Sequence, residues 1–123
     1  MKAFCITACI FIFCQCKSDR LILGKAYAEK ELKATLTDTT KYDYTETQTS
    51  IIKDSVEATT YAESILFKIY GKQKIIDERP YEIYHLGNYW LLTGTLPVGW
   101  SGGTFLIIID GRNSEVLNIK HGK

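Results

Sequence analysis

The segment 104–110, TFLIIID, constrains the fold of this 123-residue chain more than any other stretch of the sequence. Its apolar residues follow one another without alternation, so both sides of an extended chain would be hydrophobic here. A strand of this kind needs cover on both faces and a neighbouring strand on each side. The segment therefore predicts a buried, central β-strand.

Three flanking runs alternate between two faces and predict three more strands. They are PYEIYHL (80–86), NYWLLTGTL (88–96) and EVLNIKH (115–121). Gly87-Asn88, the glycine-rich connection 97–103 and the segment DGRN (110–113) supply the turns between strands. The sequence thus predicts a four-stranded antiparallel meander. Trp90 and Leu92 share the face that we expect to form the core.

Residues 55–70 predict the main helix. Asp54 and Glu57 have the spacing of a capping box, in which their side chains meet unpaired N–H groups of the first turn. Gly71 follows the last turn and can take the positive φ of a C-cap. One face of the helix carries the apolar residues Ala58, Ala62, Ile65, Leu66 and Ile69.

A helix with one apolar stripe, laid on one face of a sheet, gives an α+β fold. The opposite face of the predicted sheet is also rich in Tyr, Leu and Ile. The sequence leaves three covers open for it: the segment 17–50, curling of the sheet, or a partner.

All four cysteines, Cys5, Cys9, Cys14 and Cys16, lie in the first sixteen residues. Lys2 followed by the uncharged run 3–13 is typical of a signal peptide and too short to span a bilayer. The segment 13–16, FCQC, resembles a bacterial lipobox, which implies cleavage before Cys16 and lipid attachment to its sulfur. An ordinary secretory signal and a retained N-terminal anchor are the alternatives. A metal or disulfide site is disfavoured, because no His, Asp or Glu accompanies these cysteines.

We therefore divide the chain into a lipoprotein signal peptide (1–15), a polar tether (16–50) and a folded α+β domain (51–123). The mature protein is expected to be exported and anchored to a membrane, on the periplasmic or outer-membrane side. Within the tether, residues 21–34 predict a short helix whose weak apolar side includes Leu21, Ile22 and Leu23. This helix docks on the domain, or the whole tether is a flexible spacer between lipid and domain.

Charge and motifs argue against several classes of function. The 15 basic and 14 acidic residues nearly balance, which gives no electrostatic case for nucleic-acid binding. No motif of a metalloprotease, P-loop or serine hydrolase is present in the sequence. We expect Asp110 to serve a turn and His85 to be exposed or satisfied by a neighbour. We predict no catalytic residue, cofactor, metal or small-molecule substrate.

An ordered set of short segments resembles the immunity proteins with a nuclear-transport-factor-2-like fold, which accompany bacterial polymorphic toxins, including the Rhs type. The segments are A-x3-A-E (58–63), I-Y-G (69–71), R-P-Y (79–81), N-Y-W-L-L-T-G-T-L-P (88–97), G-G-T-F (102–105), I-I-D (108–110) and the terminal H-G-K (121–123). The resemblance implies a cystatin-like or cone-like domain with a curved sheet around the helix. It also implies a protein that binds and neutralises a cognate toxin, and no catalytic residues.

Partner recognition by such a protein would use surface side chains. Trp100 lies in a loop, and Tyr84 and Tyr89 alternate on neighbouring strands, so we select these three as candidate contacts. Two other functions stay open. One is an envelope lipoprotein that inhibits or assists a cell-wall enzyme, and the other is a small-ligand-binding or isomerase-like domain with a pocket in the sheet.

Overall fold

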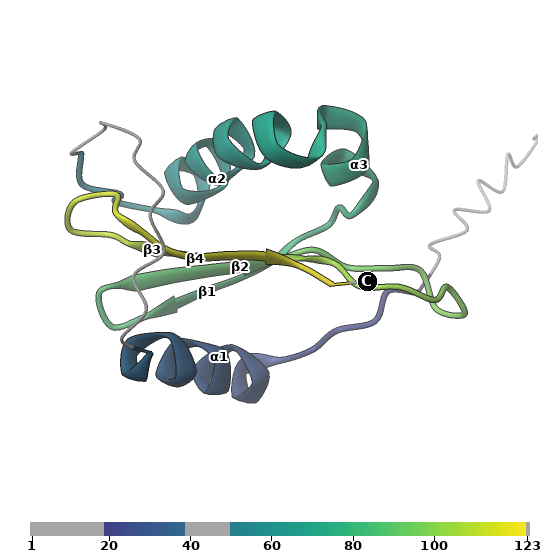
Figure 1. Cartoon of the computed structure of the whole chain (residues 1–123), viewed down its shortest axis with the longest axis horizontal. Helices are drawn as coiled ribbons and strands as arrows, with labels where there is room; N and C mark the ends of the chain where they lie inside the picture. The colour runs from purple at the N-terminus through teal and green to yellow at the C-terminus, as the bar shows by residue number, and fades with distance from the viewer. Residues whose placement is uncertain (1–18, 39–49, 123) are drawn as a thin grey trace, which may run out of the picture.

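The computed structural model describes residues 19–38 and 50–122, and the predicted signal peptide and lipid-attachment residue Cys16 lie outside this part. Seven elements follow one another: α1 (Lys25–Thr37), α2 (Ser55–Tyr70), α3 (Lys72–Asp77), β1 (Glu82–Leu86), β2 (Tyr89–Thr93), β3 (Phe105–Asp110) and β4 (Val116–His121). The sheet lies between α2 and α3 on one face and α1 on the other (Figure 1). The predicted α+β class is confirmed.

The four strands form an antiparallel sheet in the order β1-β2-β3-β4, which is the predicted meander. Every residue of β3 is buried, as expected for a strand that is apolar on both faces. Leu91 of β2 pairs with Tyr84 of β1 and Ile108 of β3, so these three side chains share one face. The register shifts between Ile108 and Ile109, where β3 pairs with β4.

Helix α2 has the predicted bounds, and Asp54 caps it as predicted, whereas the Glu57 side chain binds the N–H of Lys53 rather than that of Asp54. The Asp54 side chain accepts a hydrogen bond from Glu57 N at 2.8 Å, and Glu57 Oε2 accepts one from Lys53 N at 2.8 Å. Gly71 ends the helix with a φ of 95°, which a residue with a Cβ rarely adopts. The chain then enters the six-residue helix α3. Only Ile75 in this helix is buried, so its sequence shows no apolar stripe that would have predicted a helix.

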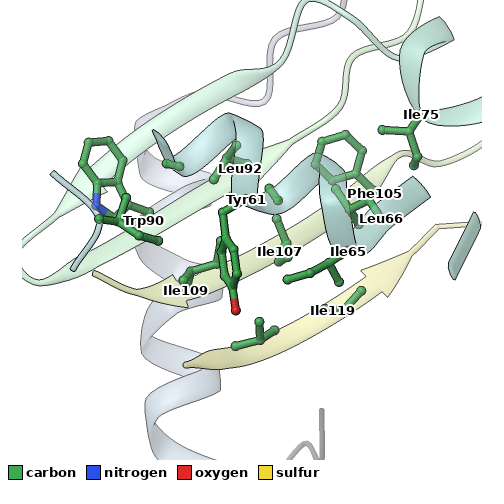
Figure 2. Packing of buried hydrophobic residues seen from close by; sticks show 14 residues of the cluster. Tyr61, Ile65, Leu66, Ile75, Trp90, Leu92, Phe105, Ile107, Ile109 and Ile119 are labelled. Atoms are coloured by element: carbon green, nitrogen blue, oxygen red, sulfur yellow. The ribbon is translucent and has the colours of Figure 1, made fainter. Parts of the chain in front are cut away.

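The main core lies between α2 and the sheet (Figure 2). Trp90 and Leu92 belong to it, as predicted. The Tyr61 hydroxyl donates to the backbone oxygen of Ser114 at 2.9 Å, so the polar group of this buried tyrosine is paired. The contributing side chains are Ala58, Tyr61, Ala62, Ile65 and Leu66 from α2, Ile75 from α3, Ile52 from the segment before α2, and Trp90, Leu92, Phe105, Ile107, Ile109, Val116 and Ile119 from the sheet.

A second, smaller core lies between α1 and the opposite face of the sheet. Ala28 is fully buried there against Leu91, Leu106 and Ile108. Of the three covers that the sequence left open for this face, the structure therefore has the one from the segment 17–50. No helix in the described parts of the chain has both the length and the apolar content needed to cross a membrane.

The predicted helix 21–34 is displaced, because α1 begins at Lys25 and residues 21–24 are not helical. Gly24 has φ 89° and ψ 171°, which are not helical angles. The carboxylate of Glu82 accepts the backbone N–H of Leu23 at 2.8 Å and of Gly24 at 2.9 Å. This contact with β1 stops the helix from extending toward the N-terminus.

Candidate partner-binding surfaces

Tyr89 and Arg112 lie together where two turns of the sheet meet. Tyr89 opens β2 and pairs with Asp110, the last residue of β3, and Arg112 lies in the turn that follows. The Arg112 Cζ atom lies 5.8 Å from the centre of the Tyr89 ring. Tyrosine and arginine are favoured residues in the energetically important centre of protein interfaces.

The carboxylate of Asp110 holds the Arg112 side chain in place. Arg112 Nε donates to Asp110 Oδ1 at 3.0 Å and Nη2 donates to Oδ2 at 2.8 Å, while Arg112 N also donates to Oδ1 at 2.9 Å. These bonds lower the pKa of Asp110 from its ordinary value. Because Asp110 is only 5% exposed and fixed by the sheet, the guanidinium is ordered before any partner arrives.

A groove of about 610 Å³ runs beside Tyr89, between α1 and the β1–β2 hairpin. The surface of its lining is mostly apolar, and the charged residues of α1 in it are Lys25, Glu29 and Lys33. The other lining residues are Leu32, Leu36, Thr37, His85, Leu86, Gly87 and Tyr89. We call Tyr89, Arg112 and this groove the hairpin end. A groove of this size can receive an apolar side chain of a partner.

Five exposed apolar side chains lie on two segments at the opposite end of the sheet: Leu21, Ile22, Leu23, Val98 and Trp100. We call these five residues the apolar end. The chain reaches this end in the extended segment before α1 and again in the connection between β2 and β3 (Figure 1). Trp100 is 68% exposed and Ile22 is 64% exposed.

Backbone hydrogen bonds join the two segments of the apolar end. Val98 N donates to Asp19 O at 2.8 Å, and Leu21 N donates to Leu96 O at 3.0 Å. Trp100 N donates to Pro97 O at 3.1 Å and closes a turn in which Gly99 has a φ of 89°. A type II turn requires this positive φ at its third residue, so Val98 lies at the tip of the turn and Trp100 at its end.

The structure does not bring the three candidate contacts together. Trp100 is at the apolar end and Tyr89 at the hairpin end. Tyr84 lies under α1, where its hydroxyl donates to Glu82 Oε1 at 2.7 Å, and this bond is the main reason that its pKa rises to about 12. A partner role for each of the three residues stays a prediction.

Local sequence patterning did not reveal two parts of these surfaces. It predicted Leu21, Ile22 and Leu23 on one side of a helix, whereas they are exposed on an extended segment. It also missed Arg112, although the spacing of Asp110 and Arg112 around Gly111 is a local signal for a turn closed by an ion pair.

Comparison with known proteins decides the family. Residues 57–123 match the family described as NTF2 fold immunity protein. The chain belongs to this family. The matched region runs from α2 to the end of the chain and includes Tyr84, Tyr89, Trp100 and Arg112, whereas α1 and the segment before it precede the match.

Two relatives of this immunity protein come from Escherichia coli (strain K12). Uncharacterized protein YhhH is 29% identical over 125 residues, which cover 97% of this chain and 87% of the relative. Uncharacterized protein YbbC is 36% identical over 73 residues, which cover 58% of this chain and 60% of the relative. No solved structure matches the chain significantly.

The buried acidic and histidine side chains of this immunity protein are engaged in internal bonds. Glu78 is 4% exposed, and its Oε1 accepts Phe105 N at 2.8 Å while its Oε2 lies 3.1 Å from His121 Nε2. The other ring nitrogen of His121 lies 2.7 Å from Gly122 O, so both nitrogens have acceptors. His85 is exposed and stacks on Trp90 with ring centres 4.1 Å apart.

These contacts are structural in kind. A general acid or base needs a nitrogen or oxygen within reach of a substrate, and the Glu78–His121 pair directs its polar atoms at the backbone and at each other. In the described residues, no three His, Cys, Asp or Glu side chains gather as a metal site would need. What the hairpin end and the apolar end offer is surface for binding.

Proposed function

We propose that this immunity protein binds one copy of a cognate bacterial toxin and blocks the toxin's active site or docking surface without chemistry of its own. The match of residues 57–123 to the immunity family is the observation that carries this proposal. The satisfied internal bonds of Glu78, His121 and Asp110 support a role without catalysis.

The hairpin end is the surface that we propose for the toxin. It offers an aromatic ring, an ordered guanidinium and an apolar groove side by side, which is the composition of an interface centre. An apolar side chain of the toxin would enter the groove beside Leu32 and Leu36. A carbonyl or carboxylate oxygen of the toxin would accept from the exposed edge of Arg112.

The lipobox-like segment before Cys16 supports a site of action outside the cytoplasm. We propose that the mature protein is exported, lipidated at Cys16 and held at a membrane, where it meets the toxin before the toxin reaches its target. An envelope enzyme in place of a toxin remains the alternative partner.

The gene immediately upstream provides the test of function. Its product is expressed in a bacterial host, directed to the cytoplasm or to the periplasm, with and without the full-length immunity protein. Rescue of growth together with a one-to-one complex in a pull-down is the expected result. If the neighbour is harmless and nothing is captured, the toxin proposal is wrong, and envelope enzymes become the partners to examine.

Substitutions at the hairpin end test the surface. We expect Tyr89→Ala to weaken the complex by about tenfold or more, as loss of a central aromatic residue commonly does. Arg112→Lys keeps the charge but removes the planar fork, and we expect it to weaken the complex too. Val56→Ser changes an exposed side chain on α2 and serves as the control. Unchanged affinity for both hairpin-end variants would place the toxin on another surface.

A further inference from the structure

The apolar end holds five of the nine large hydrophobic side chains that are exposed in the described parts of the chain. They come from two segments more than seventy residues apart in the sequence, which backbone bonds hold side by side. Exposed apolar side chains concentrated at one end of a molecule are typical of a site that meets an apolar partner.

The chain before α1 is tied to the folded body from Asp19 onward. Asp19 O accepts Val98 N at 2.8 Å, and Arg20 Nη1 donates to Thr95 O at 3.2 Å and to Asp77 O at 3.4 Å. Only Lys17 and Ser18 therefore stand between the predicted lipid-bearing Cys16 and the folded body.

This spacing limits how far the domain can lie from the membrane. Three residues of fully extended chain span about 10 Å. The polar headgroup layer on each side of a bilayer is roughly 5–7 Å thick. A lipid on Cys16 therefore keeps Asp19, and with it the apolar end, at or near the headgroups.

We propose that the apolar end inserts into the surface of the phospholipid bilayer that carries the lipid anchor. Trp100, Val98 and Ile22 enter the interfacial layer, and the hairpin end points away from the membrane. This inference rests on the proposed lipidation of Cys16 and is independent of toxin binding.

The side chains of the apolar end suit this environment. An indole ring is amphipathic and settles at the level of the headgroups, and aliphatic side chains gain from leaving water there. Arg20 is bound to two backbone oxygens, and Lys25 lies 3.8 Å from Glu29 on α1. The side chains that we place in the interfacial layer carry no charge, so the docking is apolar and does not require an anionic lipid.

Tryptophan fluorescence tests the proposal in the lipidated, full-length protein purified from membranes. The protein is placed in phosphatidylcholine vesicles with or without brominated acyl chains, which quench only tryptophans at the bilayer. We expect brominated lipid to quench part of the emission of the wild-type protein. In Trp100→Phe that quenching should disappear, because the remaining Trp90 is buried in the core.

A matched pair of valines gives the control. Val98 is 58% exposed at the apolar end, and Val56 is 72% exposed on α2. We expect Val98→Ser to reduce the lipid quenching of Trp100 and Val56→Ser to leave it unchanged. Both sites are on the surface, so neither variant should unfold the protein.

Three results would overturn the proposal. One is a mature chain whose mass shows no lipid on Cys16, since the argument begins at that residue. The second is a Trp100 emission that aqueous iodide quenches equally with and without vesicles. The third is a Trp100 emission that responds to the cognate toxin and not to brominated lipid, which would make the apolar end a protein interface. Protection from the toxin is measured separately, so failure here leaves the proposed function standing.

Discussion

Glu78 shows how one buried carboxylate can organise an end of the sheet. It binds the backbone of β3 at Phe105 and the ring of His121 at the end of β4. The backbone oxygen of Glu78 accepts Thr95 N at 2.8 Å, so the same residue also holds the chain after β2. A Cβ at Gly94 would lie 2.8 Å from Glu78 Oε1. The absence of a side chain at Gly94 therefore leaves room for the Glu78 side chain.

Replacing Glu78 should destabilise the fold. In Glu78→Ala the N–H of Phe105 stays buried without a partner, and we expect the free energy of unfolding to fall by about 1–3 kcal/mol. Urea denaturation measures the change. Glu78→Gln keeps an acceptor oxygen for Phe105 N and should recover part of the loss. Equal stability of the alanine variant and the wild type would mean that water replaces the carboxylate.

Asp110 should make stability depend on pH in the acid range. Its pKa is lowered from the ordinary 3.8, mainly by hydrogen bonds from Arg112. A carboxyl with a lowered pKa stabilises the folded state above its ordinary pKa, and this contribution is lost as the pH falls through the folded-state value. We expect Asp110→Asn to lower the urea midpoint relative to wild type near neutral pH.

The difference between Asp110→Asn and wild type should shrink as the pH at which both proteins are measured falls from the ordinary pKa of 3.8 through the lowered pKa of Asp110, because the carboxylate is then protonated. Comparing the two proteins at each pH cancels the titration of other carboxylates. A difference that stays constant over the whole range would show that Arg112 does not stabilise the charged form.

Among the elements, α1 depends most on the rest of the molecule. A helix of 13 residues is marginal by itself in water, and α1 has only one fully buried residue, Ala28. Contacts with distant strands hold it. Glu82 of β1 binds its N-terminal end, Asn118 of β4 donates to Thr35 at 3.1 Å, and Lys120 of β4 pairs with Glu31.

Loss of the Glu82 carboxylate should loosen α1 without unfolding the sheet. In Glu82→Ala the amides of Leu23 and Gly24 lose their acceptor. We expect hydrogen exchange in residues 21–37 to become about tenfold faster or more, which corresponds to roughly 1.4 kcal/mol.

Amides of β3 and the exposed substitution Glu115→Ala are the internal and external references for that measurement. Equal acceleration across α1 and β3 would mean that Glu82 stabilises the whole fold rather than this one element.

For the whole molecule, the main feature is that the two candidate surfaces lie at opposite ends of the sheet. The meander places the β1–β2 and β3–β4 turns at one end and the β2–β3 connection at the other (Figure 1). Helix α1 is about 20 Å long and begins just after the segment of the apolar end, and the groove of the hairpin end lies along it from Lys25 to Thr37. One end can therefore face a membrane while the other receives a protein.

At the scale of the whole molecule, we predict that a substitution at one end changes the function of that end and leaves the function of the other end unchanged. Vesicles carrying the lipidated immunity protein should recruit the cognate toxin in a flotation assay. We expect Tyr89→Ala to reduce recruitment while lipid quenching of Trp100 stays unchanged, and Val98→Ser to reduce quenching while recruitment stays unchanged. If each substitution changed both readouts equally, the two ends would not act independently.

The sequence by itself determined the elements whose signals are local. The Asp54–Glu57 cap, the apolar stripe of α2 and the alternation of the strands depend on neighbouring residues, and they predicted the main helix, the strand order and Trp90 in the core. The ordered short segments likewise predicted the immunity family that the comparison confirmed.

Only the tertiary structure decided where α1 begins, that it covers the second face, and that the segment of Leu21 to Leu23 lies beside the connection that holds Trp100. These features depend on bonds between distant positions, such as Glu82 with Gly24 and Asp19 with Val98, and on Glu78 with His121. A local pattern indicates whether a segment prefers helix or strand. It cannot indicate that the carboxylate of Glu82, 58 residues away, ends a helix at Gly24, because this contact forms only once the sheet has folded.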